Sequence, residues 1–222
     1  MKTIFSVVAA TIAAAALAAC NQTASNGNSA MNHGGMHNAS SNSMNHNAMP
    51  MNSNMPGMDH SSMQSSPNAA SAPYDLQFID TMTAHHKEAV DMAKMVDGKT
   101  QNPDIKKFAA QIIADQEKEI GQMKDWREKW FAGKPVAMNM EMPGMKDSMK
   151  MDMAKLTNAK DKDFDLAFID MMTPHHNGAV TMAKEAVTKA ERPEIKTLAN
   201  TIIKAQEAEV KMMNGWKEKW SK

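Results

Sequence analysis

The sequence predicts an all-α protein, an antiparallel four-helix bundle built from two duplicated helical hairpins. Residues 75–130 align without a gap with residues 165–220, and 29 of the 56 aligned positions are identical. Such a duplication indicates that one supersecondary unit occurs twice. Strand signals are scarce, because β-branched runs are short and do not alternate with polar residues. One hairpin alone leaves an apolar face bare, and two hairpins bury those faces against each other.

The first 19 residues have the pattern of a lipoprotein signal peptide. A basic start precedes an apolar stretch, residues 4–19, that is too short for a convincing membrane span. It ends in Leu17-Ala18-Ala19-Cys20, which resembles a bacterial lipobox. Because Cys20 is the single cysteine, we expect it to carry lipid rather than metal. An ordinary signal peptide is the alternative. With lipid on Cys20, we expect the chain to be exported and held at a lipid bilayer by acyl chains. The expected location is the cell envelope, facing the periplasm, or outside the cell. Asn21, directly after Cys20, fits sorting to the outer membrane.

Residues 20–73 predict a disordered tether rich in methionine and histidine. Between Asn21 and Pro73 there is no Leu, Ile, Val or aromatic residue, so this segment cannot offset the entropy of ordering its chain. Thioether sulfur favours Cu(I), and imidazole binds Cu(I), Cu(II) and other metals. Low-complexity sequence without a metal role is the alternative. The auxiliary metal ligands predicted here are Met31, His33, Met36, His37, Met44, His46, Met58 and His60.

The predicted hairpins occupy residues 74–133 and 165–222. In the first helix of the first hairpin, apolar residues recur at three- and four-residue steps. Asp75 is the expected cap of this helix. The second helix is expected to begin at Asn102, a capping residue followed by proline, and to end before Gly133. A connector, residues 134–164, spans the bundle and carries Met138, Met140, Met142, Met145, Met149, Met151 and Met153.

A His-His motif with nearby methionines occurs in each repeat. Consecutive helical residues differ by about 100° around the axis, so we expect one histidine of each pair to point inward and the other toward a seam or solvent. The second helix of each hairpin offers Gln116, Glu117, Glu119 and Met123, or their copies. The predicted metal ligands are Met82, His85, His86, Met92, Glu117 and Met123, and in the second repeat Met172, His175, His176, Met182, Glu207 and Met213.

A purely structural role for these residues is the alternative. Buried histidines often have satisfied hydrogen bonds, helical methionines often fill gaps, and duplication copies core residues as faithfully as ligands. Methionine and histidine also gather in the tether and methionine in the connector, where core packing is not expected, and this favours metal binding. A di-iron centre needs Glu-x-x-His on two helices. Met82 and Thr83 stand three residues before His85 and His86, which argues against such a centre.

The two copies differ just before the histidines, where Ala84 in the first corresponds to Pro174 in the second. A proline inside a helix removes one backbone hydrogen bond. The apolar stripe through Phe168 and Met172 favours a helix that continues through Pro174, and a helix that starts at Pro174 is the alternative. A kink there predicts that the two motifs differ in copper affinity.

Both repeats resemble the bacterial family called domain of unknown function 305. Its pattern runs F-I-x-x-M-x-x-H-H-x-x-A-x-x-M-A and then P-x-I-K-x-x-A-x-x-I-I-x-x-Q-x-x-E-I-x-x-M-x-x-W. It matches residues 78–93 and 103–126, and again 168–183 and 193–216, with Val210 in place of isoleucine. The resemblance implies a ferritin-like helical bundle and an exported copper-binding protein of the copper-resistance type.

The expected function is therefore that of an exported copper- and silver-binding lipoprotein that sequesters or hands on Cu(I) or Cu(II). A copper exporter or oxidase is a possible partner. Equal totals of 25 basic and 25 acidic residues give no charge excess that would attract nucleic acid. No cofactor motif, nucleophile or acid–base pair indicates an enzyme. The alternatives are a copper-dependent redox protein or enzyme of the cell envelope and a surface lipoprotein whose methionines scavenge oxidants.

Overall fold

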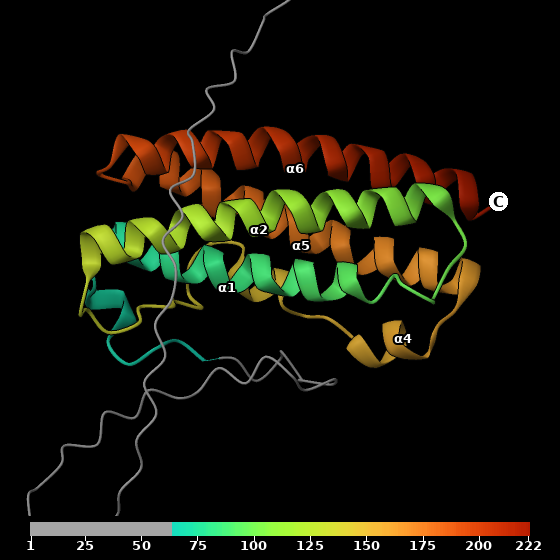
Figure 1. Cartoon of the computed structure of the whole chain (residues 1–222), viewed down its shortest axis with the longest axis horizontal. Helices are drawn as coiled ribbons and strands as arrows, with labels where there is room; N and C mark the ends of the chain where they lie inside the picture. Colours follow the sequence, from blue (N-terminus) through green and yellow to red (C-terminus); the bar gives the residue numbers. More distant parts are fainter. Residues whose placement is uncertain (1–63) are drawn as a thin grey trace, which may run out of the picture. The chain divides into compact units, whose positions relative to one another are not determined.

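The predicted all-α bundle is confirmed by a computed structural model, which describes residues 64–222 (Figure 1). Helices are the only regular elements of that part of the chain. Two short helices lie in the connector, and a 3-10 turn precedes the first long helix. The long helices are α1 (Tyr74–Lys94), α2 (Pro103–Phe131), α5 (Asp161–Lys189) and α6 (Pro193–Trp220); the short ones are η2 (Ala69–Ser71), α3 (Met145–Ser148) and α4 (Met153–Asn158).

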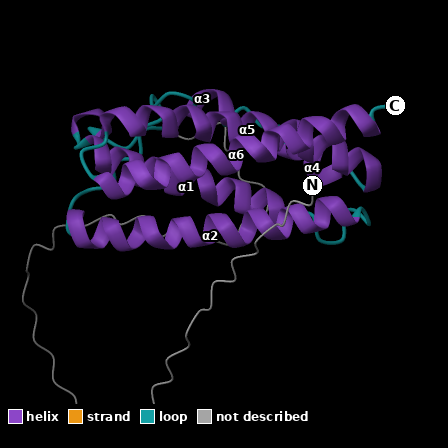
Figure 2. Cartoon of the chain, turned by 90° about the horizontal axis from the view of Figure 1, so that it is seen from above, coloured by secondary structure: helices purple, strands orange, loops and turns teal. Residues whose placement is uncertain are grey.

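The two hairpins meet through their first helices. Within each repeat, α1 packs on α2 and α5 packs on α6, and the contact between the repeats is made by α1 and α5. The short helix α3 packs on α5, and Figure 2 shows it beside that helix. None of the helices within residues 64–222 is long and apolar enough to cross a membrane.

Helix ends follow the capping chemistry of the sequence, with one exception. Asn102 caps α2 by accepting a hydrogen bond from the backbone N–H of Asp104 at 3.1 Å. Asp75 was expected to cap its own helix, but it does not, because α1 begins one residue earlier, after Pro73. Its carboxylate instead accepts the backbone N–H groups of Glu191 and Arg192, at 3.0 and 3.1 Å. Asp75 therefore caps the start of α6 in the other repeat.

Helix α5 is longer than its counterpart α1. It begins at Asp161, four residues before the aligned repeat, and continues through Pro174 to Lys189. The added first turn buries Phe164 in the core. The prediction that the helix passes through Pro174 is confirmed.

The last residues of the predicted tether, 64–73, are ordered against the bundle. The backbone N–H of Ser66 donates to the carbonyl of Met138 at 2.8 Å, and the N–H of Met140 donates to the hydroxyl of Ser65 at 2.9 Å. Ala69 is buried. The predicted boundary at residue 73 is therefore wrong, because this segment pairs its backbone with the connector.

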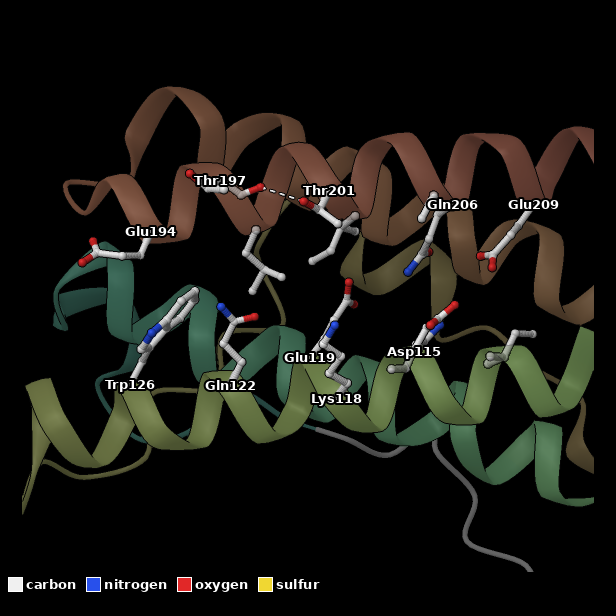
Figure 3. Close-up of a pocket in the computed structure, with 15 residues that line it drawn as sticks. Asp115, Lys118, Glu119, Gln122, Trp126, Glu194, Thr197, Thr201, Gln206 and Glu209 are labelled. Carbon is white, nitrogen blue, oxygen red and sulfur yellow. Dashed lines mark hydrogen bonds between the residues drawn. The ribbon is translucent and has the colours of Figure 1, made fainter. Parts of the chain in front are cut away.

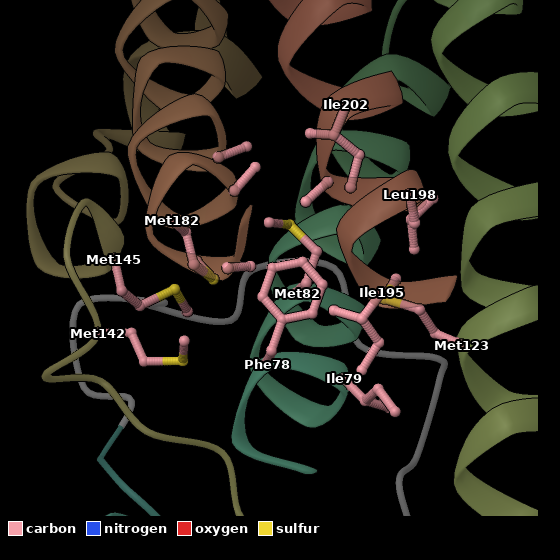
Figure 4. Close-up of a cluster of buried hydrophobic side chains, with 14 of the residues drawn as sticks. Phe78, Ile79, Met82, Met123, Met142, Met145, Met182, Ile195, Leu198 and Ile202 are labelled. Carbon is pink, nitrogen blue, oxygen red and sulfur yellow. The ribbon is translucent and has the colours of Figure 1, made fainter. Parts of the chain in front are cut away.

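The core consists of two clusters of apolar side chains. The first core cluster includes Phe78, Met82, Met123, Met182 and Ile202, and Figure 4 shows it with the methionine sulfurs marked. The second core cluster contains Met92, Phe108, Phe168, Met172 and Met213.

Several methionines of the connector belong to the first core cluster. In Figure 4, Met142 and Met145 lie beside Met182 of α5, and Met140 and Met149 are buried in the same cluster. The expectation that core packing cannot explain the connector's methionines is wrong. The flexible thioether side chain adapts to the irregular surface that the connector covers.

Candidate metal centre

Four buried imidazoles form a polar layer between the two core clusters. Along α1, residues of the first core cluster precede His85 and His86, and residues of the second follow. Along α5 the order around His175 and His176 is reversed. All four rings are at most 1% exposed. One histidine of each pair was expected to face a seam or solvent; none faces solvent, because α1 and α5 are each covered on both sides.

The two histidine pairs meet at the centre of this layer. The ring centroids of His85 and His175 are 3.8 Å apart. Within each pair the centroids are farther apart, at 6.4 Å for His85 and His86 and 6.3 Å for His175 and His176. The inner member of each pair therefore faces the other repeat, and the outer member faces the second helix of its own hairpin.

Each outer histidine is hydrogen-bonded to a carboxylate. His86 Nε2 lies 2.7 Å from Glu119 Oε2, and His176 Nε2 lies 2.9 Å from Glu209 Oε2. An ionised carboxylate only accepts hydrogen bonds, so this network assigns the proton of each ring to Nε2. The Nδ1 atoms of both rings are buried without a hydrogen-bond partner. In the neutral form of these rings, Nδ1 would hold a lone pair that no other group within residues 64–222 uses.

The inner histidines have different neighbours. His85 Nε2 lies 3.0 Å from the hydroxyl of Ser148. His175 Nε2 lies 3.7 Å from Glu88 Oε2, which is within reach of an ion contact but too long for a hydrogen bond, and it has no hydrogen-bond partner within residues 64–222. Nδ1 of both inner rings also lacks a hydrogen-bond partner.

The inner imidazoles are neutral at neutral pH. Burial lowers the pKa of His85 well below its ordinary value of 6.5, and the neighbouring histidines, His175 first, lower it further. Burial also lowers the pKa of His175, although the carboxylate of Glu88 opposes that effect. A neutral imidazole is the form that binds metal, because protonation removes the lone pair.

The centroid distance within each pair is compatible with one metal ion held by both rings. A metal about 2 Å from a nitrogen of each ring places the ring centroids roughly 6 Å apart, close to the 6.4 and 6.3 Å observed. Cu(I) and Ag(I) are closed-shell monovalent ions that accept two nitrogen ligands. Within residues 64–222, no three side chains of His, Cys, Asp or Glu converge into a group that could hold a metal.

Glu117 and Glu207, which the sequence analysis chose as ligands, do not reach the histidines. Glu117 forms an exposed ion pair with Lys94 at 3.0 Å, and Glu207 forms one with Lys184 at 2.7 Å. The carboxylates two positions later contact the histidines instead, because two residues on a helix are separated by about 200°. The buried positions Gln116, Ile120 and Met123 already mark the face that Glu119 flanks, and this signal could have identified it.

The six predicted methionine ligands are all buried and lie on both sides of the histidine layer. Two of them accept hydrogen bonds from threonines of their own repeat, Met123 Sδ from Thr83 at 3.9 Å and Met213 Sδ from Thr173 at 3.7 Å. Their role as ligands stays a prediction. The first core cluster holds Met82, Met123 and Met182, and the second holds Met92, Met172 and Met213.

The predicted lipidation site and the auxiliary ligands of the tether lie outside the described residues. They are Cys20, Met31, His33, Met36, His37, Met44, His46, Met58 and His60.

A groove of about 570 Å³ runs between α2 and α6 (Figure 3). Glu119 and Glu209, which bind the outer histidines, both line it, and their side chains are 15% and 13% exposed. Gln116 and Gln206 also line the groove, and the Oε1 atom of each is buried without a hydrogen-bond partner. The groove therefore connects solvent with the carboxylates that contact the outer histidines.

Comparison with known proteins gives one matching family model and several similar structures. The model for "Domain of unknown function (DUF305)" matches residues 12–127 and 75–217. An uncharacterized protein of Acanthamoeba polyphaga mimivirus is 42% identical over 49 residues, 22% of this chain and 32% of that protein, so the match spans about a third of the relative.

Two solved structures extend this comparison. CopM in the Cu(I)-bound form is 42% identical, with a TM-score of 0.56, and the match covers 66% of this chain and 96% of CopM. A DUF305 protein from Streptomyces coelicolor is 29% identical, with a TM-score of 0.58, over 66% of this chain and 93% of that one. The chain therefore belongs to the DUF305 family.

Proposed function

We propose that this chain is an exported copper- and silver-binding lipoprotein whose four buried histidines hold monovalent metal ions. The observation that carries the proposal is the environment of the imidazoles: all four Nδ1 atoms are buried without a hydrogen-bond partner among the residues that the structure describes. A buried polar atom without a partner costs free energy, and a bound metal ion would remove that cost.

The neighbours of the histidines support a soft cation as cargo. Metal-binding histidines usually donate their second N–H to a carboxylate, which raises the basicity of the ligating nitrogen. Glu119 and Glu209 accept such hydrogen bonds from His86 and His176. Their negative charge also offsets the positive charge of an ion placed between the rings.

CopM provides independent support, because it has been solved in Cu(I)-bound, Cu(II)-bound and silver-bound forms. Those structures are 42 to 44% identical to this chain over 66% of its length. The role proposed here is sequestration of copper in the cell envelope, or its transfer to a partner such as an exporter or oxidase. Cys20 would hold the protein at the lipid bilayer, and the groove between α2 and α6 would admit the ion.

The eight histidines of the chain allow a matched experiment, because four lie in the bundle and four in the tether. The mature full chain is titrated with Cu(I) or Ag(I) against a chromophoric competitor. Replacing His85, His86, His175 and His176 by asparagine should abolish the tightest class of sites. The same replacement at His33, His37, His46 and His60 should leave that class intact.

A bundle variant that keeps its helicity and its tightest sites contradicts the proposal. The lipid anchor is tested separately by labelling cells with a palmitate analogue, comparing the wild type with Cys20→Ala. Absence of label from the wild type removes the lipoprotein part and leaves the metal part standing.

A further inference from the structure

The two repeats differ next to their histidines at one buried position, where Glu88 in the first corresponds to Gly178 in the second. Glu88 is 2% exposed, and its carboxylate lies beside His175, the inner histidine of the other repeat. Because the repeats pack through equivalent helices, a glutamate at position 178 would lie beside His85. The chain has glycine there, so the inner histidines receive different partners.

Helix α3 fills the space beside Gly178. A Cβ atom at that position would lie 2.4 Å from Ser148 Cβ and 2.6 Å from the carbonyl oxygen of Gly144. These distances are far below van der Waals contact, so any side chain at position 178 would displace α3. This close approach brings the hydroxyl of Ser148 to 3.0 Å from His85 Nε2. A hydroxyl from the connector thus occupies the place of the missing carboxylate.

The direction of the Ser148 hydrogen bonds fixes the proton of His85. The hydroxyl of Ser148 donates to the backbone carbonyl of Met145 at 2.8 Å. A hydroxyl has a single hydrogen, so only its lone pairs remain for His85. His85 Nε2 must then carry the ring proton and donate it, which leaves the lone pair on the buried Nδ1.

We propose that Ser148 is the positioning residue that presents Nδ1 of His85 to metal, whereas Glu88 places a carboxylate beside His175 without a hydrogen bond to it. The two histidine pairs are therefore inequivalent metal sites. The first pair has one carboxylate, Glu119, and a neutral hydroxyl. The second pair has two carboxylates, Glu209 and Glu88, and binds a cation more tightly. This inference rests on the proposed function for its metal-binding part only.

The tautomer of His85 is tested in the metal-free protein by ¹⁵N NMR of the imidazole nitrogens. The wild type should show His85 protonated at Nε2, and Ser148→Ala should produce a mixture of tautomers at His85 while His86 and His176 keep theirs. Thr157→Ala is the matched control, because it removes a connector hydroxyl that also bonds a backbone carbonyl but is exposed. A wild-type His85 protonated at Nδ1, or an unchanged tautomer in a folded Ser148→Ala, overturns the assignment.

The affinity difference is tested in two backgrounds that each retain one histidine pair. His175→Asn with His176→Asn leaves the first pair, and His85→Asn with His86→Asn leaves the second. Ag(I) should bind the second pair more tightly. Loss of a group that contacts a metal-binding histidine usually lowers metal affinity by about 10- to 100-fold. We expect a loss of this size from Glu88→Gln at the second pair only. We expect it from Ser148→Ala at the first pair only.

Equal affinities in the two backgrounds, or a second pair that is insensitive to Glu88→Gln, overturn the inequivalence. Absence of Ag(I) binding in both backgrounds overturns the proposed function and the affinity difference together. The NMR measurement needs no metal, so it decides the role of Ser148 separately. Circular dichroism of each variant distinguishes a lost contact from a lost fold.

Discussion

The rings of His85 and His175 lie against each other at the centre of the bundle, with centroids 3.8 Å apart and planes tilted by 34°. They occupy equivalent positions of the two repeats, so the internal symmetry axis of the duplication passes between them. Each ring faces a different repeat, and neither contacts solvent. The two candidate metal sites are therefore in contact through their inner rings. A proton or metal ion bound to one inner ring acts electrostatically on the other.

Burial of these two rings makes the stability of the metal-free protein depend on pH. The pKa values of His85 and His175 in the folded protein are lowered from 6.5, so the unfolded chain takes up their protons first as pH falls. The contribution of these two histidines to the free energy of unfolding should be constant above pH 6.5, and it should decrease as the pH falls below 6.5. The slope is about 1.4 kcal/mol per pH unit for each histidine that stays neutral.

Urea denaturation of the metal-free protein between pH 5 and pH 7.5 measures this slope. Replacement of His33 and His37 in the tether is the control and should leave the slope unchanged. A flat profile below pH 6.5 would show that the inner rings accept protons in the folded state.

The carboxylates of the groove should govern metal affinity. Glu119→Gln with Glu209→Gln removes the charge beside both outer histidines, and Cu(I) affinity should fall by about 10- to 100-fold. Glu117→Gln with Glu207→Gln removes the same charge from exposed ion pairs and should change affinity little. Competition titration of both double variants checks this. Equal losses of Cu(I) affinity in the two double variants would indicate that the net charge of the protein, and not contact with the histidine rings, sets the affinity.

Gly178 should tolerate no side chain. Gly178→Ala places a Cβ against Ser148 and Gly144, and overpacking of this kind usually costs about 1–3 kcal/mol. Gly121→Ala is the matched control, because that helical glycine has no atom near the added Cβ. It should stabilise the protein by about 0.5–1 kcal/mol through helix propensity. Chemical denaturation of both variants measures the difference, and similar stabilities would contradict the close docking of α3.

Truncation should separate the tether from the segment that packs on the bundle. Deleting residues 21–63 should lower the number of copper ions bound and leave the melting temperature nearly unchanged. Deleting residues 21–73 should lower the melting temperature as well, because it removes the hydrogen bonds of Ser65 and Ser66 to the connector. Mass spectrometry and thermal unfolding measure the two effects. Unchanged copper stoichiometry after the shorter deletion would remove the tether from the metal-binding function.

The repeat and its apolar stripes were enough to predict the four long helices, because periodicity is a local property of the sequence. The choice between Glu117 and Glu119 was only partly local. The face through Ile120 and Met123 favours Glu119, but the contact with His86 depends on the rotation of α2 against α1. The same holds for His85 and His86, whose common burial depends on helices that cover α1 from two sides.

The connector could not be predicted for another reason. Met138, Met140 and Met142 alternate as in a strand, but this segment forms no strand. Their spacing therefore does not reveal that residues such as Met142 and Met145 enter the core. Their burial depends on the shape of the surface beneath them, which exists only once the two hairpins have packed. The role of Ser148 depends in turn on Gly178, thirty positions later.

The carboxylate of Asp75, which holds the start of α6, also bears on how the duplicated chain arose. Its counterpart Asp165 accepts a hydrogen bond from Asn102 at the start of α2, so each repeat supplies an aspartate to the other repeat's second helix. A polypeptide with a single repeat would lack that partner and would also leave its inner histidine without a facing ring. Such an ancestor could complete these contacts only by pairing with a second copy of itself, and gene duplication would have turned that dimer into one chain whose halves were then free to diverge.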